Sequence, residues 1–102
     1  MRRVMVRYKV KPDQVEDNER YVRAVYAELK QKDVAELRYA TFKLADGVSF
    51  VHLASIETED GKSPLNELAA FKAFQAELKD RCDEPPMAVD ITEVGSYRFF
   101  ED

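Results

Sequence analysis

The dipeptide Asp46-Gly47, set between two strand-like stretches, constrains the fold of this chain more than any other feature. An Asp-Gly pair best supplies the positive φ angles that a two-residue β-hairpin turn needs. Because side chains alternate between the faces of a strand, such a turn also fixes which residues share a face. With Ala45 opposite Val48, one face is expected to carry four cross-strand pairs: Lys43 with Phe50, Thr41 with His52, Tyr39 with Ala54, and Leu37 with Ile56.

The other face of this hairpin is also largely apolar. It is expected to carry Arg38, Ala40, Phe42, Leu44, Val51, Leu53 and Ser55. A sheet with apolar side chains on both faces needs two covering layers. The sequence therefore predicts a covering layer on each side of the sheet.

A strand and a helix are expected before the hairpin. Residues 4–10 alternate between apolar and polar, which is the period of a half-buried strand. Apolar residues then recur at helical spacing and predict a first helix over residues 12–31, with Asp13 and Glu16 resembling a capping box. The apolar stripe of this helix also includes Asn18, so one polar side chain is expected to face inward.

A helix and a strand are expected after the hairpin. Ser63, followed by proline, is expected to be the N-cap of a second helix with that proline in its first turn. This helix is expected to end near Cys82. The last strand is expected over residues 89–91 and 94–100, with a bulge at Gly95.

The order strand, helix, strand, strand, helix, strand predicts an α+β, ferredoxin-like βαββαβ fold in one domain over residues 1–102. Both helices would cover the same face of a four-stranded antiparallel sheet. The opposite face, with Phe42, Val51 and Leu53, would then be apolar and exposed, which is typical of an interaction surface. An isologous homodimer formed through this open sheet face would cover it.

Charge and hydropathy exclude several classes of partner. The chain has 16 Lys and Arg against 20 Asp and Glu, a net charge of -4, and so no electrostatic footprint for a nucleic acid. No apolar run approaches the roughly 20 residues of a membrane span, and no signal-peptide pattern is visible. The single Cys82 suits a reducing compartment, so a cytoplasmic protein is expected.

Motifs for metals and cofactors are lacking as well. One histidine and one cysteine, far apart in the sequence, make no metal-ligand pattern. The three glycines are too widely spaced for a phosphate-binding loop. The sequence therefore predicts neither a metal nor a nucleotide cofactor.

Several stretches together carry a resemblance that spans nearly the whole chain. They are the order and length of the elements, the third-strand segment 50–56, the loop into Ser63-Pro64-Leu65 with the later Phe71 and Phe74, and the closing segment 94–100. In these features the chain resembles the antibiotic biosynthesis monooxygenase-like members of the dimeric α+β barrel superfamily.

The resemblance implies two sheets packed face to face in a dimer, with a ligand cleft in each subunit between helices and sheet. It implies cofactor-free oxidation of quinols and polyphenols in some members and haem degradation in others. Because this chain has no Trp, and no His in its second helix to ligate haem iron, haem is not expected.

His52 is the only histidine, and the only side chain expected to titrate near neutrality without perturbation. The resemblance implies that residues of this parity on the third strand face the helices and the cleft. There the imidazole is a candidate catalytic base, which would take a proton from a phenolic substrate and leave a phenolate that reacts with oxygen. The alternative is a structural His52, hydrogen-bonded across the strand to Thr41 or to a tyrosine.

Four further polar side chains are candidates for substrate binding: Tyr8, Tyr39, Asn18 and Thr41. The tyrosines would hydrogen-bond a substrate oxygen, or would serve as amphipathic core residues. Asn18 would donate to a ligand oxygen, or would cap a neighbouring backbone group.

Three functions remain open. The first is a cofactor-free monooxygenase acting on a quinol or phenolic small molecule. The second is a non-catalytic homodimer that binds a small hydrophobic ligand or a protein partner. The third is an isomerase or lyase of the same superfamily, again with His52 as base. One fold hosts unrelated functions, so the fold alone does not separate them.

Overall fold

The computed structural model, which describes residues 1–100, contains a four-stranded antiparallel sheet and helices in the expected order. The strands are β1 (Arg2–Val10), β2 (Leu37–Lys43), β3 (Ser49–Ile56) and β4 (Cys82–Asp90), and their order in the sheet is β2-β3-β1-β4. The helices are α1 (Val15–Lys32), α2 (Ala69–Ala76) and α3 (Leu78–Arg81), with short 3₁₀ helices η1 (Pro12–Gln14) and η2 (Pro64–Glu67). The expected ferredoxin-like α+β fold is confirmed.

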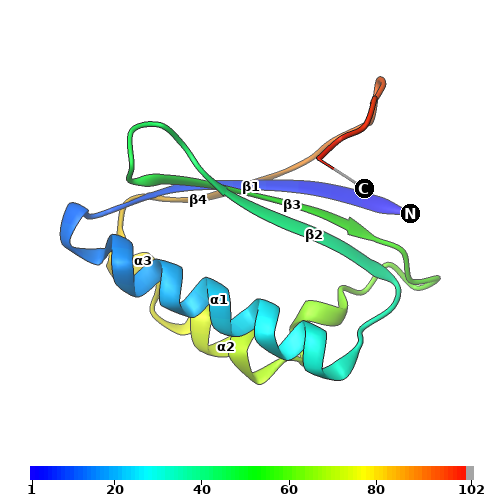
Figure 1. Ribbon diagram of the computed structural model, residues 1–102, viewed down its shortest axis with the longest axis horizontal. Helices are drawn as coiled ribbons and strands as arrows, with labels where there is room; N and C mark the ends of the chain where they lie inside the picture. Colours follow the sequence, from blue (N-terminus) through cyan, green and yellow to red (C-terminus); the bar gives the residue numbers. More distant parts are fainter. Residues whose placement is uncertain (101–102) are drawn as a thin grey trace.

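The helices lie on one side of the sheet. Figure 1 shows α1 and α2 side by side beneath the strands, while the segment that follows β4 lies on the other side. α1 is long because its 18 residues contain neither Pro nor Gly. It ends at Asp33, whose left-handed φ of 50° lets its backbone N–H donate to the carbonyl oxygens of the last turn.

The hairpin has the expected register, although its loop is longer than expected. All four predicted pairs are present in β2 and β3. The loop is closed by Gly47 N–H donating to the Leu44 carbonyl at 3.0 Å, and the Leu44 N–H donates to the Ser49 carbonyl at 2.9 Å. Within this hairpin loop only Gly47 takes a positive φ, at 79°, whereas Asp46 accepts backbone hydrogen bonds through its carboxylate. The two-residue turn was therefore wrong, but a loop lengthened by one residue at each end keeps the same register.

The core lies between the sheet and the helices. Its buried members come from β1, α1, β3, η2, α2, α3 and the residue between η2 and α2: Tyr8, Val10, Val25, Phe50, Leu65, Leu68, Phe74 and Leu78. Burial of such a side chain stabilises the fold by roughly 1.5–3 kcal/mol. The helix-facing side of the hairpin is thus the interior side.

Two expectations for the helices were wrong in detail. Asp13 lies inside the 3₁₀ turn that precedes α1, and Gln14 occupies the N-cap without a side-chain hydrogen bond, so no capping box forms. The second helix is interrupted, because Leu68 is extended at φ -89° and ψ 129°. Its start is as expected, since the Leu65 N–H donates to the Ser63 hydroxyl at 3.2 Å.

The last strand lies earlier than expected. β4 begins at Cys82 and contains Pro85-Pro86, which the sequence placed before the strand. An edge strand tolerates prolines because one side of it has no hydrogen-bonding neighbour, and β4 is an edge strand with register shifts opposite residues 7–10. Residues 94–100 are not a strand, no bulge forms at Gly95, and Arg98 takes a left-handed φ of 49°.

Candidate functional site

A partly open cavity of about 540 Å³ lies between the sheet and the segment that holds η2, α2 and α3. Its lining comes from the helix-facing side chains of the sheet and from this segment: Arg2, Val4, Val6, Tyr8, Tyr39, His52, Ala54, Ile56, Ser63, Leu65, Asn66, Phe71, Phe74, Gln75, Leu78, Lys79 and Pro86. Most of these side chains are aliphatic or aromatic. A largely apolar cavity with a few polar groups is the usual form of a small-molecule site.

His52 lies on the helix-facing side of β3, as the resemblance implies, and only 4% of it is exposed. Its Nε2 is 2.8 Å from the hydroxyl oxygen of Tyr8 on β1. Its Nδ1 is 2.7 Å from the hydroxyl oxygen of Tyr39 and 3.0 Å from Oγ1 of Thr41, both on β2. Both ring nitrogens are therefore occupied by protein hydroxyl groups.

Aromatic rings enclose the imidazole. The centroids of Tyr8, Phe74 and Tyr39 lie 5.3, 5.6 and 5.7 Å from that of His52. Burial lowers the pKa of His52 from 6.5 to about 4, because the surroundings disfavour the charged form. The imidazole is thus neutral at physiological pH, with one nitrogen protonated and the other carrying a lone pair.

The two tyrosines of the site keep their protons. Burial is the main influence on the pKa of Tyr8 and of Tyr39, and it raises both well above the usual phenol value. Near neutrality both side chains therefore act as hydroxyl donors and acceptors and not as phenolates.

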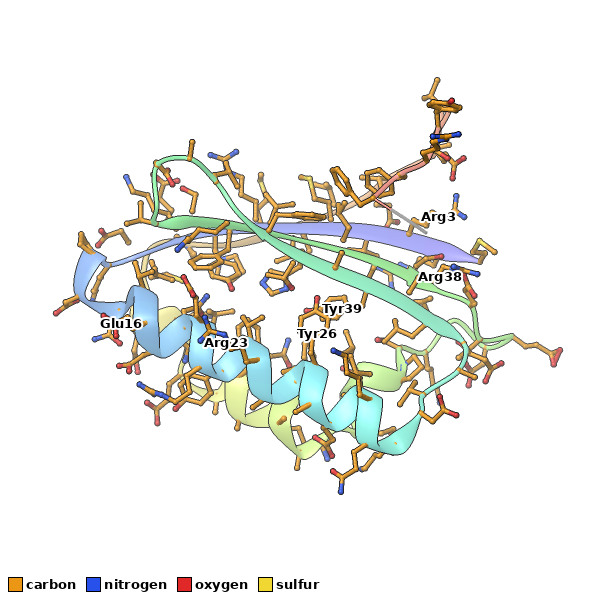
Figure 2. All side chains as sticks on the ribbon, viewed as in Figure 1. Arg3, Glu16, Arg23, Tyr26, Arg38 and Tyr39 are labelled. Carbon is orange, nitrogen blue, oxygen red and sulfur yellow. The ribbon has the colours of Figure 1, made fainter. Side chains whose placement is uncertain are left out.

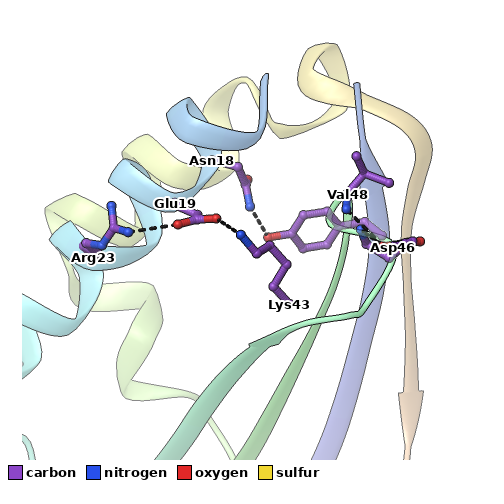
Figure 3. A network of polar contacts seen from close by, with 8 residues as sticks. Asn18, Glu19, Arg23, Lys43, Asp46 and Val48 are labelled. Atoms are coloured by element: carbon purple, nitrogen blue, oxygen red, sulfur yellow. Dashed lines mark hydrogen bonds and ion pairs between the residues drawn. The ribbon is translucent and has the colours of Figure 1, made fainter. Parts of the chain in front are cut away.

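Asn18 and Arg81 form a second layer behind Tyr8. The Asn18 amide nitrogen donates to the Tyr8 hydroxyl at 2.9 Å (Figure 3). Arg81 donates to the Asn18 amide oxygen through Nε at 3.3 Å and Nη2 at 3.2 Å, and to the Phe74 carbonyl at 3.0 Å. Its guanidinium carbon lies 4.4 Å from the ring centroid of Tyr21, and only 4% of Arg81 is exposed.

Tyr26 extends the network toward α1. Its hydroxyl is 2.8 Å from Oγ1 of Thr41, and its ring stacks on Tyr39 with centroids 5.3 Å apart. Figure 2 shows Tyr26 and Tyr39 together in the space between α1 and the sheet. Burial raises the pKa of Tyr26 as well.

The structure joins all five predicted site residues in one hydrogen-bonded network, but they differ in their access to the cavity. Tyr8, Tyr39 and His52 line it. Thr41 lines a separate hollow of about 220 Å³ near α1, and Asn18 is fully buried. Asn18 is thus placed to act through Tyr8.

Sequence reasoning missed Arg81 and Tyr26. Arg81 continues the apolar stripe of the second helix one turn beyond Leu78, and a charged residue in such a position was the available signal. Tyr26 falls at an apolar position of the helical spacing over residues 12–31, and such a position gives no sign of its contact with Thr41.

Within residues 1–100, no group of three or more His, Cys, Asp or Glu side chains is arranged to hold a metal ion. Over the same residues, no helix has both the length and the apolar character needed to cross a membrane.

Comparison with solved structures places this chain among proteins of one fold. A protein from Nitrosomonas europaea, provisionally named an antibiotic biosynthesis monooxygenase, superimposes with a TM-score of 0.74 at 20% identity, covering 91% of this chain and 89% of its own. A structure named antibiotic biosynthesis monooxygenase has a TM-score of 0.75 at 14% identity, covering 93% of this chain and 100% of its own. Rv0793 from Mycobacterium tuberculosis gives 0.74 at 14% identity, with coverages of 93% and 96%.

At these identities the likeness establishes the fold. The chain has the α+β fold of the antibiotic biosynthesis monooxygenase-like structures, which confirms the resemblance expected from the sequence at that level. No protein-family model and no curated protein matches the sequence.

Proposed function

We propose that the cavity binds a phenolic or quinol-type compound and that the protein oxidises it with molecular oxygen, without a metal or an organic cofactor. The observation that supports this most is the wall of the cavity at His52, where a tyrosine hydroxyl meets each ring nitrogen beside a largely apolar, aromatic lining. An aromatic ring suits that lining, and hydroxyl groups suit its oxygen. The monooxygenase names of two structures with this fold support the same class of reaction.

Such a reaction balances without a cofactor because the substrate supplies the electrons. A phenol that reacts with one O₂ gives a quinone and one water: one oxygen atom enters the ring, the other leaves in water, and the substrate loses two hydrogen atoms. The phenolate is the form with enough electron density to react with oxygen; the phenol releases its proton to solvent water, and a proton is taken up again when the product water forms. The site's contribution is to bind the ring and to stabilise the negative charge on its oxygen.

The sequence predicts a base at His52, whereas the geometry favours an indirect role. The pKa of His52 is lowered to about 4, so its imidazole is a weak base. Its nitrogens already contact Tyr8, Tyr39 and Thr41. We therefore assign to His52 the role of holding the Tyr39 hydroxyl toward the substrate oxygen, which makes His52 a positioning residue and Tyr39 the direct contact.

Oxygen uptake by the purified protein over a panel of quinols and polyphenols tests this proposal. We expect saturable uptake that falls at least tenfold in both Tyr39→Phe and His52→Ala, a loss typical of removed transition-state contacts. Tyr97→Phe is the matched control, because Tyr97 is 84% exposed. Uptake that is absent with every compound, or equal in all variants, would contradict the proposal.

A second candidate function is non-catalytic binding of the same class of compound. The observation that favours it is the fully occupied hydrogen-bonding capacity of His52, which leaves no free base. Calorimetric titration that shows binding of a quinol, together with no oxygen uptake above the uncatalysed rate, would select this function.

We also propose that the protein is a homodimer formed through the open face of the sheet. This face carries Met5, Phe42, Val51 and Leu53 on the inner strands and on β2, and the exposed Met87 and Val89 on β4. Phe100 covers part of it, with its ring centroid 5.5 Å from that of Phe42. No helix covers this face within residues 1–100 (Figure 1), and a second copy would do so.

A further inference from the structure

In the hydrogen-bond network around His52, the donor and the acceptor of each bond can be assigned, and the assignment starts at Arg81. A guanidinium group has N–H donors only and no acceptor, so the Asn18 atom that faces it has to be the amide oxygen. The amide nitrogen of Asn18 therefore faces Tyr8 and donates to its hydroxyl oxygen. The orientation of this amide follows from the chemistry of Arg81 and not from a choice between two similar atoms.

The role of Tyr8 in turn fixes which ring nitrogen of His52 is the acceptor. The Tyr8 oxygen accepts from Asn18, and its single proton remains free to donate to Nε2 of His52 at 2.8 Å. Tyr8 is only 2% exposed, so an undonated hydroxyl proton would be buried and costly. Nε2 is consequently the acceptor, and in a neutral imidazole the proton then resides on Nδ1.

The groups around Nδ1 favour the same tautomer independently. The hydroxyl oxygens of Tyr39 and Thr41 both lie within hydrogen-bonding distance of Nδ1, at 2.7 and 3.0 Å. An N–H shared between two oxygens is a common arrangement, whereas the single lone pair of an unprotonated ring nitrogen accepts one hydroxyl proton well. With Nδ1–H as donor, the Tyr39 hydroxyl oxygen accepts from His52, and the hydroxyl proton of Tyr39 is not needed for that bond.

We propose that the Arg81–Asn18 pair fixes which groups donate and which accept along this series of hydrogen bonds, so that Tyr39 offers its O–H as a donor to the cavity. Such a donor selects aromatic compounds that carry an acceptor oxygen, a carbonyl or a phenolate. The inference rests on the proposed function only in taking this cavity as the ligand site. Tyr39 lines the cavity together with the rings of Phe71 and Phe74, which suit a planar partner. Asn18 and Arg81 are positioning residues, since both act through Tyr8.

The chain offers a clean test, because His52 is its only histidine. In the full-length protein without a histidine tag, labelled with ¹⁵N-histidine, NMR of the imidazole reports directly which nitrogen carries the proton. We expect Nδ1–H in the wild type. In Asn18→Asp the new carboxylate is an acceptor only, so Tyr8 donates its hydroxyl proton to it. The Tyr8 oxygen then accepts from His52, and we expect the imidazole proton of His52 to move to Nε2. An Nε2–H tautomer in the wild type would overturn the proposal even if Asn18→Asp failed to fold.

Binding measurements test the consequence for the cavity. Titration with 1,4-naphthoquinone and with naphthalene compares two rings of similar size, of which only the first has acceptor oxygens. We expect a wild-type preference for the quinone of roughly threefold to tenfold, the worth of one net hydrogen bond. This preference is expected to vanish in Tyr39→Phe and in Asn18→Asp, while naphthalene affinity stays unchanged.

The outcomes separate this inference from the proposed reaction. A quinone preference that is absent in the wild type, or that persists in Tyr39→Phe, overturns the inference. A preference that follows the expected pattern in a protein that consumes no oxygen upholds the inference and contradicts the oxidation.

Discussion

Tyr8 and His52, on the adjacent strands β1 and β3, are joined by a hydrogen bond of 2.8 Å between the phenolic oxygen and Nε2. This bond connects the buried Asn18–Arg81 pair on one side with Tyr39 and the cavity on the other. The same hydroxyl group therefore contributes to the stability of the core and to the orientation of the site.

Replacing Tyr8 by Phe is expected to destabilise the protein by about 1–3 kcal/mol, the cost of leaving buried polar groups without partners. The variant keeps the ring, but the Asn18 amide and Nε2 of His52 each lose a hydrogen bond. Urea denaturation measures the change, with Tyr97→Phe at an exposed position as the control. Equal midpoints for the two variants would mean that the Tyr8 hydroxyl contributes nothing to the fold.

The lowered pKa of His52 predicts that stability falls as the pH falls. The pKa is 6.5 when the group is unperturbed and about 4 in the folded protein, so between these values the unfolded chain binds a proton that the folded chain does not. The contribution of His52 is complete above pH 6.5 and decreases toward pH 4. From pH 7.5 to pH 5 we expect a loss of about 2 kcal/mol from this group.

The His52→Gln variant isolates this contribution. Asp46, Glu19 and Glu28 also have lowered pKa values and add their own loss of stability in acid. Because they are common to both proteins, the difference in pH slope between wild type and variant measures His52 alone. Identical slopes would place His52 in an environment open to water.

Placing a charge on the open sheet face is expected to dissociate the proposed dimer. Leu53 on β3 points away from the helices, and a buried unpaired carboxylate there would cost several kcal/mol, with the exact amount set by local relaxation. Sedimentation of the wild type is expected to show a dimer, and Leu53→Asp a monomer. Ala27→Asp, on the exposed side of α1, is the control and should leave the assembly intact.

A Leu53→Asp protein that sediments like the wild-type dimer would contradict assembly through this face. A wild type that sediments as a monomer at high concentration would contradict the dimer itself.

Much of the site could be predicted from local sequence pattern. The alternation around Asp46-Gly47 placed Tyr39, Thr41 and His52 on one face, and this held although the loop is longer than a two-residue turn. Register depends on the parity of the strands, which a symmetric change of loop length leaves untouched.

The parts that could not be predicted depend on contacts between distant segments. Arg81 lies 63 residues from Asn18, and no local pattern pairs them. The prolines of β4 were expected to precede the strand, because the edge position that tolerates them within it is a property of the whole sheet. Residues 94–100 have an apolar composition that suits a strand, but the structure gives them no neighbouring strand.

The most direct test of the proposed oxidation is mass spectrometry of the product formed from a phenolic substrate under ¹⁸O₂. If the protein is a cofactor-free monooxygenase, the product gains one ¹⁸O atom, at a rate that rises with protein concentration and drops in Tyr39→Phe. A product that contains no ¹⁸O, or that forms equally fast without the protein, would contradict this account.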